Sequence, residues 1–221
     1  MNQNQIHELL QLFVGSDPYR PKFMQPWRDG ENVFATENHI MIRIRGSLTD
    51  HEYPIDHKII NPSPWDNKIT GFISTEALDN ALSSAPLVDE LKSCGENKKC
   101  PECHGEGKVT WEYEIWTKEF DCPVCDGEGY IERERWVPSG RKIISDKSFI
   151  RIENKIFKSH YIDLVRRSMA FIGVDHVEVG ITDECLPALF RFTPDIDLIL
   201  MPCNPSFSLD SIHAEIPISK L

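Results

Sequence analysis

The sequence has no apolar run long enough to cross a bilayer: 40% of its 221 residues are hydrophobic, and the charged 27% interrupts them. Its first residues, Met1 to Gln5, have neither the basic start nor the apolar stretch of a secretory signal peptide. We therefore expect a cytoplasmic protein with no membrane partner, in a compartment where cysteines stay reduced.

The sequence also lacks the short motifs that mark common active sites. It contains no glycine-rich phosphate loop ending in Lys-Ser or Lys-Thr, no Gly-x-Ser-x-Gly and no His-Glu-x-x-His. Several histidines have no carboxylate at a spacing typical of catalysis: His51, His57, His160 and His176. These absences predict that the chain is not an enzyme.

A surplus of basic residues is missing as well. There are 24 lysines and arginines against 35 carboxylates, a net charge of −11, which disfavours nucleic acid as a partner. One stretch differs from this average, since residues 141–167 hold eight basic residues against three acidic ones. The stretch is either an ordinary solvated surface or a site for phosphate groups.

What the sequence does have is two copies of one phrase, Cys-x-x-Cys-x-Gly-x-Gly, at Cys100–Gly107 and Cys122–Gly129. Four cysteines from two tight turns match the tetrahedral sulfur ligands of a structural Zn²⁺. Glycines after each pair allow a sharp turn and let backbone N–H groups point at the sulfurs. We predict one structural zinc ion with Cys100, Cys103, Cys122 and Cys125 as its ligands.

Other interpretations of the cysteines are weaker. Disulfides are typical of small secreted chains, and seven cysteines cannot all pair. Cys94 lies close enough to compete as a ligand, and His104 lies inside the first phrase and is a less favoured ligand. Cys185 and Cys203 lie in apolar surroundings, which predicts buried, unreactive thiols.

The repeated phrase resembles the cysteine-rich region of the DnaJ family, which has four copies and two zinc sites. This chain has two copies, so the resemblance implies one zinc site and a hairpin shape over about residues 97–138. No His-Pro-Asp of a J-domain accompanies it, so the resemblance does not imply J-domain activity. We predict an inserted zinc hairpin at 96–140, between domain parts 1–95 and 141–221.

Hydrophobic periodicity predicts the elements around and inside this segment. A helix is expected in the first fifteen residues, a hairpin of strands at 32–36 and 40–45, and a second helix from Ser74 or Thr75 that could include Leu87 and Leu91. Within the zinc segment, 109–115 alternates like a strand, and 130–137 is expected to pair with it. Three tryptophans there are expected to form an aromatic cluster, which is either a small core or, as the less favoured alternative, a platform for a ligand: Trp111, Trp116 and Trp136.

The last eighty residues predict the order β-α-β-β-β. A strand pair or long strand at 148–158 precedes a helix over 160–171, with Ser159 as its N-cap. Three strands follow, at 176–182, 186–193 and 195–202. Helices and antiparallel strands in separate runs predict an α+β fold.

Short phrases of these flanks resemble a domain of the bacterial sliding clamp, the DNA polymerase III beta clamp family. They are Phe157–Val165 at a helix start, Leu198–Pro202 in a last strand and Val33–His39 in a strand and turn. The resemblance implies one clamp-like domain, where a clamp subunit has three, and helices that face DNA. It therefore implies weak, sequence-independent DNA contacts by Lys158, Arg166 and Arg167.

Two hypotheses for function follow. The first is a non-enzymatic, zinc-binding accessory protein of DNA replication or otherwise associated with DNA. The alternative is a protein-binding adaptor or chaperone-like module that uses the acidic zinc hairpin. Residues 96–140 have a net charge of −5, with six basic and eleven acidic residues, and this favours a protein partner for the hairpin.

Overall fold

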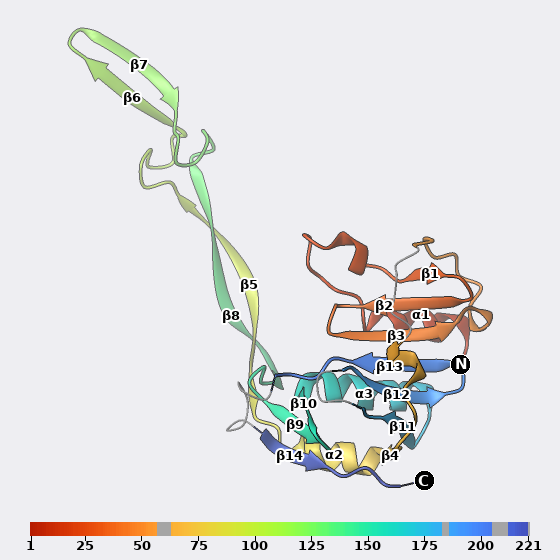
Figure 1. Cartoon of the computed structure of the whole chain (residues 1–221). Helices are drawn as coiled ribbons and strands as arrows, with labels where there is room; N and C mark the ends of the chain where they lie inside the picture. Colours follow the sequence, from red (N-terminus) through yellow and green to blue (C-terminus); the bar gives the residue numbers. More distant parts are fainter. Residues whose placement is uncertain (57–62, 183–185, 205–211, 221) are drawn as a thin grey trace. The chain divides into compact units, whose positions relative to one another are not determined.

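The computed structural model describes residues 1–56, 63–182, 186–204 and 212–220 (Figure 1). The chain divides into two compact units. Unit 1 consists of Met1–Pro86 and Ile144–Leu221, and unit 2 is Leu87–Ile143. No helix in the described part of the chain is both long and apolar enough to span a membrane.

The main element of unit 1 is an antiparallel sheet of seven strands in the order β1-β2-β3-β13-β12-β11-β4. Its strands, in chain order, are β1 (Trp27–Asp29), β2 (Asn32–Thr36), β3 (Ile40–Arg45), β4 (Gly71–Ser74), β11 (His176–Gly180), β12 (Ala188–Thr193) and β13 (Ile196–Leu200). The two halves of the chain meet where β13 pairs with β3, with Leu198 opposite Ile42. Both halves therefore build one sheet.

A second sheet in unit 1 has three strands, β9 (Phe149–Ile152), β10 (Lys155–Lys158) and β14 (Ile212–Ile216). β9 and β10 form a hairpin that turns at Glu153, whose φ is +52°. β14 lies parallel to β9 on its other side. The predicted strand pair at 148–158 is confirmed in this hairpin.

Three helices complete unit 1: α1 (Gln3–Gln11), α2 (Thr75–Ser83) and α3 (Ser159–Ile172). Ser74 caps α2 by accepting a hydrogen bond from the backbone N–H of Ala77. The predicted N-cap at Ser159 is wrong, because α3 begins at that residue and Lys158 is the N-cap. The Ser159 hydroxyl is buried and instead accepts a hydrogen bond from Ser148 at 2.8 Å. Short 3₁₀ turns lie at Pro21–Phe23, Gly46–Leu48 and Ser63–Asp66.

The core of unit 1 lies between α1, α3 and one face of the large sheet. Strand β3 illustrates how the sheet contributes to this core. Ile40, Ile42 and Ile44 are buried on one face, and the residues that alternate with them are less buried. The opposite face has a smaller cluster around Trp27, Phe34, Trp65 and Leu189. Helices and antiparallel strands in one unit form an α+β fold, as the sequence predicts.

Unit 2 consists of two strand pairs. β5 (Leu87–Lys99) pairs with β8 (Tyr130–Ile144), and β6 (Lys108–Tyr113) forms an antiparallel hairpin with β7 (Trp116–Asp121). Figure 1 shows the first pair as a long ribbon in yellow and green.

Three predictions about this segment are wrong. Residues 87 and 91 belong to β5, because α2 ends at Ser83. Residues 130–137 pair with β5, because β7 already occupies the place beside β6. The tryptophans form no core, since Trp111, Trp116 and Trp136 are 62%, 71% and 58% exposed.

Candidate metal centre

The four cysteines of the repeated phrase lie together in unit 2. Their sulfur atoms are all within 4.8 Å of one another. The Cys100 and Cys122 sulfurs are 3.8 Å apart, and those of Cys103 and Cys125 are 3.7 Å apart. All four residues are free thiols and are buried. The cluster is a possible metal site.

The spacing of the sulfurs fits a tetrahedral ion. Four sulfurs at about 2.3 Å from a central zinc ion are about 3.8 Å from one another. The two measured separations, 3.8 and 3.7 Å, agree with this edge length. Four thiolates also leave no ligand position for water, which is typical of structural and not catalytic zinc sites.

Each phrase folds into the same turn, and its backbone explains the residues between the cysteines. His104 and Asp126 occupy equivalent positions with φ of +54° and +48°. The glycines that follow also have positive φ, a conformation that costs little only for glycine. These glycines are Gly105 and Gly107 in the first turn, and Gly127 and Gly129 in the second.

The two turns pack against each other through these glycines. A Cβ atom on Gly107 would overlap the carbonyl oxygen of Gly127, and one on Gly129 would lie 2.5 Å from that of Gly105. The backbone N–H of Cys122 donates to Gly107, and that of Cys100 donates to Gly129, each at 2.8 Å. This reciprocal contact brings two cysteine pairs together around one centre.

Backbone N–H groups also point at two of the sulfurs. Gly107 donates to the Cys103 sulfur and Gly129 donates to the Cys125 sulfur, each at 3.2 Å. Such hydrogen bonds favour the thiolate, which is the form that binds metal. The glycines therefore allow the tight turns, let the two turns pack closely, and favour the charged form of the sulfurs.

The pKa values of two of the thiols, Cys103 and Cys125, nevertheless shift in opposite directions. Burial raises the pKa of the Cys103 thiol, but N–H groups of Gly105 and Gly107 outweigh it and bring this pKa from 9.0 to about 7. Burial also raises the pKa of Cys125, the Gly129 N–H opposes it only in part, and the neighbouring thiols take it to about 12. A divalent cation would remove this conflict by stabilising all four thiolates.

Unit 2 has little else to fold around. Apart from Gly107 and Gly129, its four cysteines are the only buried residues in the described part of this unit. Val109 and Ile131 pack against them and are partly buried. These two residues are 22 positions apart, as are Cys100 and Cys122, so the repeat extends beyond the phrase that we identified from the sequence.

The remaining predicted cysteine and histidine positions do not join the cluster. His104 is exposed, and Cys94 is an exposed residue of β5. Cys203 is half-buried in unit 1, and burial raises the pKa of its thiol. Cys185 lies outside the described residues.

The predicted DNA-contacting residues lie in unit 1, at or on α3. Lys158 is the N-cap of the helix, and Arg167 is an exposed residue of it. The side chain of Arg166 is bound to Asp79 of α2, with Nε 2.6 Å from Oδ1. This ion pair joins residues far apart in the sequence, and no local pattern indicates it.

Most of the basic stretch at 141–167 is paired within its own unit. In unit 2, Lys142 is 2.7 Å from Asp89, and Arg141 lies 3.7 Å from Glu90. In unit 1, Arg151 is 2.7 Å from Glu215, and the buried Lys155 donates to the Leu186 carbonyl at 2.6 Å. Four of the eight basic residues of this stretch, Arg141, Lys142, Arg151 and Arg166, thus pair with a carboxylate of the folded chain.

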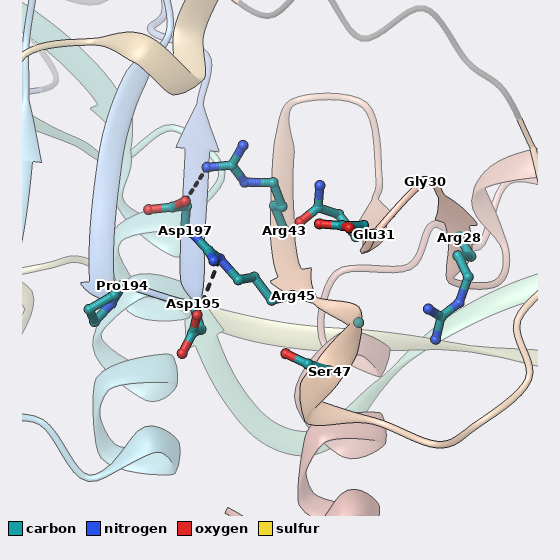
Figure 2. A pocket seen from close by; sticks show the side chains of 11 residues that line it. Arg28, Gly30, Glu31, Arg43, Arg45, Ser47, Pro194, Asp195 and Asp197 are labelled. Carbon is teal, nitrogen blue, oxygen red and sulfur yellow. Dashed lines mark hydrogen bonds and ion pairs between the residues drawn. The ribbon is translucent and has the colours of Figure 1, made fainter.

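A pocket of about 660 Å³ in unit 1 is also balanced in charge. Three arginines and three carboxylates line it, from β1 to β3 and the β12–β13 turn. Figure 2 shows Arg43 reaching Asp197 and Arg45 reaching Asp195; the second pair is 3.2 Å apart. Arg191 also binds Asp197, at 3.0 Å. The carboxylates compete with any anionic ligand for these arginines.

No family model and no curated protein matches the chain. Solved structures with similarity to it include DNA polymerase sliding clamps from Bacillus subtilis (12% identity, TM-score 0.45, 91% of this chain and 62% of the clamp) and from Pseudomonas aeruginosa with ligand (13%, 0.45, 92% and 65%). Another is a DnaN sliding clamp, DNA polymerase III subunit beta, from Bartonella birtlesii bound to griselimycin (10%, 0.47, 92% and 65%).

The chain thus spans less than two thirds of the length of each of these clamps. At these identities and TM-scores, the likeness carries no conclusion about what this chain does. The resemblance of the cysteine phrase to the DnaJ family has no counterpart in these comparisons and stays a prediction.

Proposed function

We propose that the chain is a non-enzymatic accessory protein in which one structural zinc ion folds unit 2, and unit 2 contacts a protein partner. The observation that carries the proposal is the burial of the four cysteines in a unit with almost no other buried side chain. A segment with so little apolar core needs a metal or cross-link to hold a fixed structure. Zinc binding to four thiolates supplies on the order of 10 kcal/mol in small zinc modules.

Elemental analysis of the purified chain tests the metal. We expect one zinc per chain, and loss of that zinc from Cys103→Ser, whereas Cys94→Ser keeps it because Cys94 is exposed and outside the cluster. Four sulfurs in a tetrahedron also suit iron. One iron per chain, two zinc ions, or full retention of structure without metal would contradict the proposal.

A protein partner for unit 2 is supported by its surface. Twelve of the 18 large hydrophobic residues that are exposed in the described structure lie in unit 2. The segment from Cys100 to Gly129 has eight carboxylates and two lysines, a net charge of −6. Apolar side chains exposed among negative charges suit a protein surface and repel nucleic acid.

Quantitative co-purification from the source cells tests the partner. The full chain is compared with a chain in which a short linker replaces Leu87–Ile143. We expect at least one protein to be retained by the first and lost from the second. Equal recovery of all proteins with both chains would contradict a binding role for unit 2.

Association with DNA, and with DNA replication, rests on the sequence resemblance to sliding clamps. Its best support in unit 1 is the exposed Arg167 on α3, whereas Arg166 is held by Asp79. A titration of duplex DNA at low salt tests it, with Arg167→Glu expected to weaken binding and Glu178→Gln as a control on β11. Absence of binding, or binding that ignores Arg167 and salt, would reject this role.

A further inference from the structure

Four of the six residues on one face of the β6–β7 hairpin are aromatic. Directly opposed residues of an antiparallel pair lie on the same face, and alternate pairs share it. Trp111 is opposite Lys118, and two further pairs flank it on the same face: Val109 with Phe120, and Tyr113 with Trp116. We call Trp111, Tyr113, Trp116 and Phe120 the aromatic face.

The reverse face of the hairpin is polar. It consists of the pairs Lys108–Asp121, Thr110–Glu119 and Glu112–Thr117. A hairpin with one aromatic and one polar face normally packs its aromatic face against another layer. Here the aromatic residues are 47% to 71% exposed, so no layer of the described structure covers them.

The aromatic face is ordered before any partner arrives. The rings of Trp111 and Tyr113 stack with centroids 5.9 Å apart and planes 8° from parallel. The Lys118 ammonium lies 5.0 Å from the centre of the Phe120 ring. At the base of the hairpin, the Cys122 N–H donates to the Gly107 carbonyl, so the metal turns fix both strands. Rigid aromatic side chains of this kind lose little entropy on binding.

Charge selects among the molecules that could cover this face. Eight carboxylates and two lysines lie between Cys100 and Gly129, and a bound Zn²⁺ with four thiolates would add two more negative charges. Single-stranded nucleic acid also stacks on aromatic rings, but it requires a positive groove. A second copy of this chain, with a net charge of −11, is repelled for the same reason.

We propose that the aromatic face binds a protein partner whose surface presents an apolar strip flanked by lysine and arginine. The apolar strip would cover the four rings, and the basic residues at its ends would meet carboxylates that lie outside the reverse face, such as Glu114 in the turn between β6 and β7. This inference rests on the proposed function, because it names the surface and the partner chemistry of the contact made by unit 2.

Selection of random twelve-residue peptides displayed on phage, against the zinc-loaded full chain, tests the proposal. We expect the selected peptides to be rich in apolar residues together with Lys and Arg, and to bind less tightly as salt rises. Affinity for synthetic copies should fall at least about tenfold in Trp111→Thr and in Trp116→Thr, as expected for aromatic residues at the centre of an interface. Thr117→Ser, on the reverse face, should bind like the native chain.

Four outcomes would overturn the inference: acidic selected peptides, no selected peptide, equal affinity of the tryptophan variants, or a native dimer that Trp116→Thr converts to monomer. Binding of a twenty-residue oligothymidylate that is lost in Trp111→Thr would do so as well, in favour of nucleic acid. Zinc content separates these results from the proposed function. If the chain contains one zinc ion but the tryptophan variants bind the peptides as tightly as the native chain, the inference fails and the metal proposal stands. If the chain contains no zinc, the metal proposal fails whatever the peptide affinities are.

Discussion

At the scale of single residues, the cluster of four cysteines could be predicted because its determinants lie within the two repeated motifs. Cysteine spacing and the glycines after each pair lie within eight residues, and the structure brings the four sulfurs together. The fate of the basic residues could not be predicted in this way. The partner of Arg166 is Asp79, 87 positions earlier, and only the packing of α2 against α3 brings them together.

Gly107 offers a test of the packing between the two turns. Gly107→Ala would place a Cβ atom against the Gly127 carbonyl, whereas Gly140→Ala would meet nothing within 4 Å. Both glycines have positive φ, +74° and +88°, so both variants incur the same backbone strain of roughly 1–2 kcal/mol. We expect Gly107→Ala to cost about 1–3 kcal/mol beyond its control, as overpacking does elsewhere.

Competition with a chromogenic chelator measures this difference as zinc affinity. Each kilocalorie per mole corresponds to a factor of about five in the dissociation constant. Equal zinc affinities of the two alanine variants would show that the turns do not require the close glycine contact.

At the scale of elements, alternation is visible in β3 and β9, because one face of each of these strands is buried. The same rule misled in unit 2. Trp111 and Tyr113 alternate with polar residues like half-buried strand residues, yet their face is exposed. Strand β5 has no alternation, since both its faces are exposed along most of its length, and so it could not be distinguished from a continuation of α2.

His213 makes the attachment of β14 sensitive to pH. Its Nδ1 lies 3.0 Å from the Ser148 hydroxyl, which donates to Ser159 at the start of α3. Burial lowers the pKa of His213, and a hydrogen bond to the backbone of Ala81 on α2 opposes this only in part. Burial also lowers the pKa of His160 on α3, in spite of the nearby Asp146.

A histidine with a lowered folded-state pKa binds more protons when unfolded. The free energy of unfolding should therefore fall as the pH drops below the unfolded-state pKa, about 6.5. We expect urea unfolding of the native chain to show lower stability at pH 5.5 than at pH 7.5. His213→Gln should reduce this difference, whereas His104→Gln, at an exposed position of unit 2, should retain it. A pH dependence unchanged by His213→Gln would contradict the assignment.

At the scale of the whole molecule, neither flank of unit 2 could form the large sheet alone. Strands β1 to β4 come from one flank and β11 to β13 from the other, and β3 meets β13 along five residue pairs. Long-range pairing of this kind has no signature in local sequence. Strands β2, β3 and β11 to β13 were predicted from local sequence, whereas β1, β4 and the order of the strands in the sheet were not.

The last prediction concerns the independence of unit 1. The chain leaves it at Pro86 and returns at Ile144, and the backbone N–H of Ser145 donates to the Pro86 carbonyl at 2.9 Å. A turn of about four Gly and Ser residues can therefore replace Leu87–Ile143, and closing a shorter loop costs less entropy. The main core contains no residue of unit 2.

We expect the shortened chain to bind no zinc, and to unfold in one cooperative transition with a midpoint close to that of unit 1 in the full chain. Circular dichroism during thermal unfolding measures this, with zinc-depleted Cys103→Ser as the control that keeps the full length. If the shortened chain aggregates or melts without cooperativity while Cys103→Ser does not, then unit 1 needs unit 2 to complete its fold.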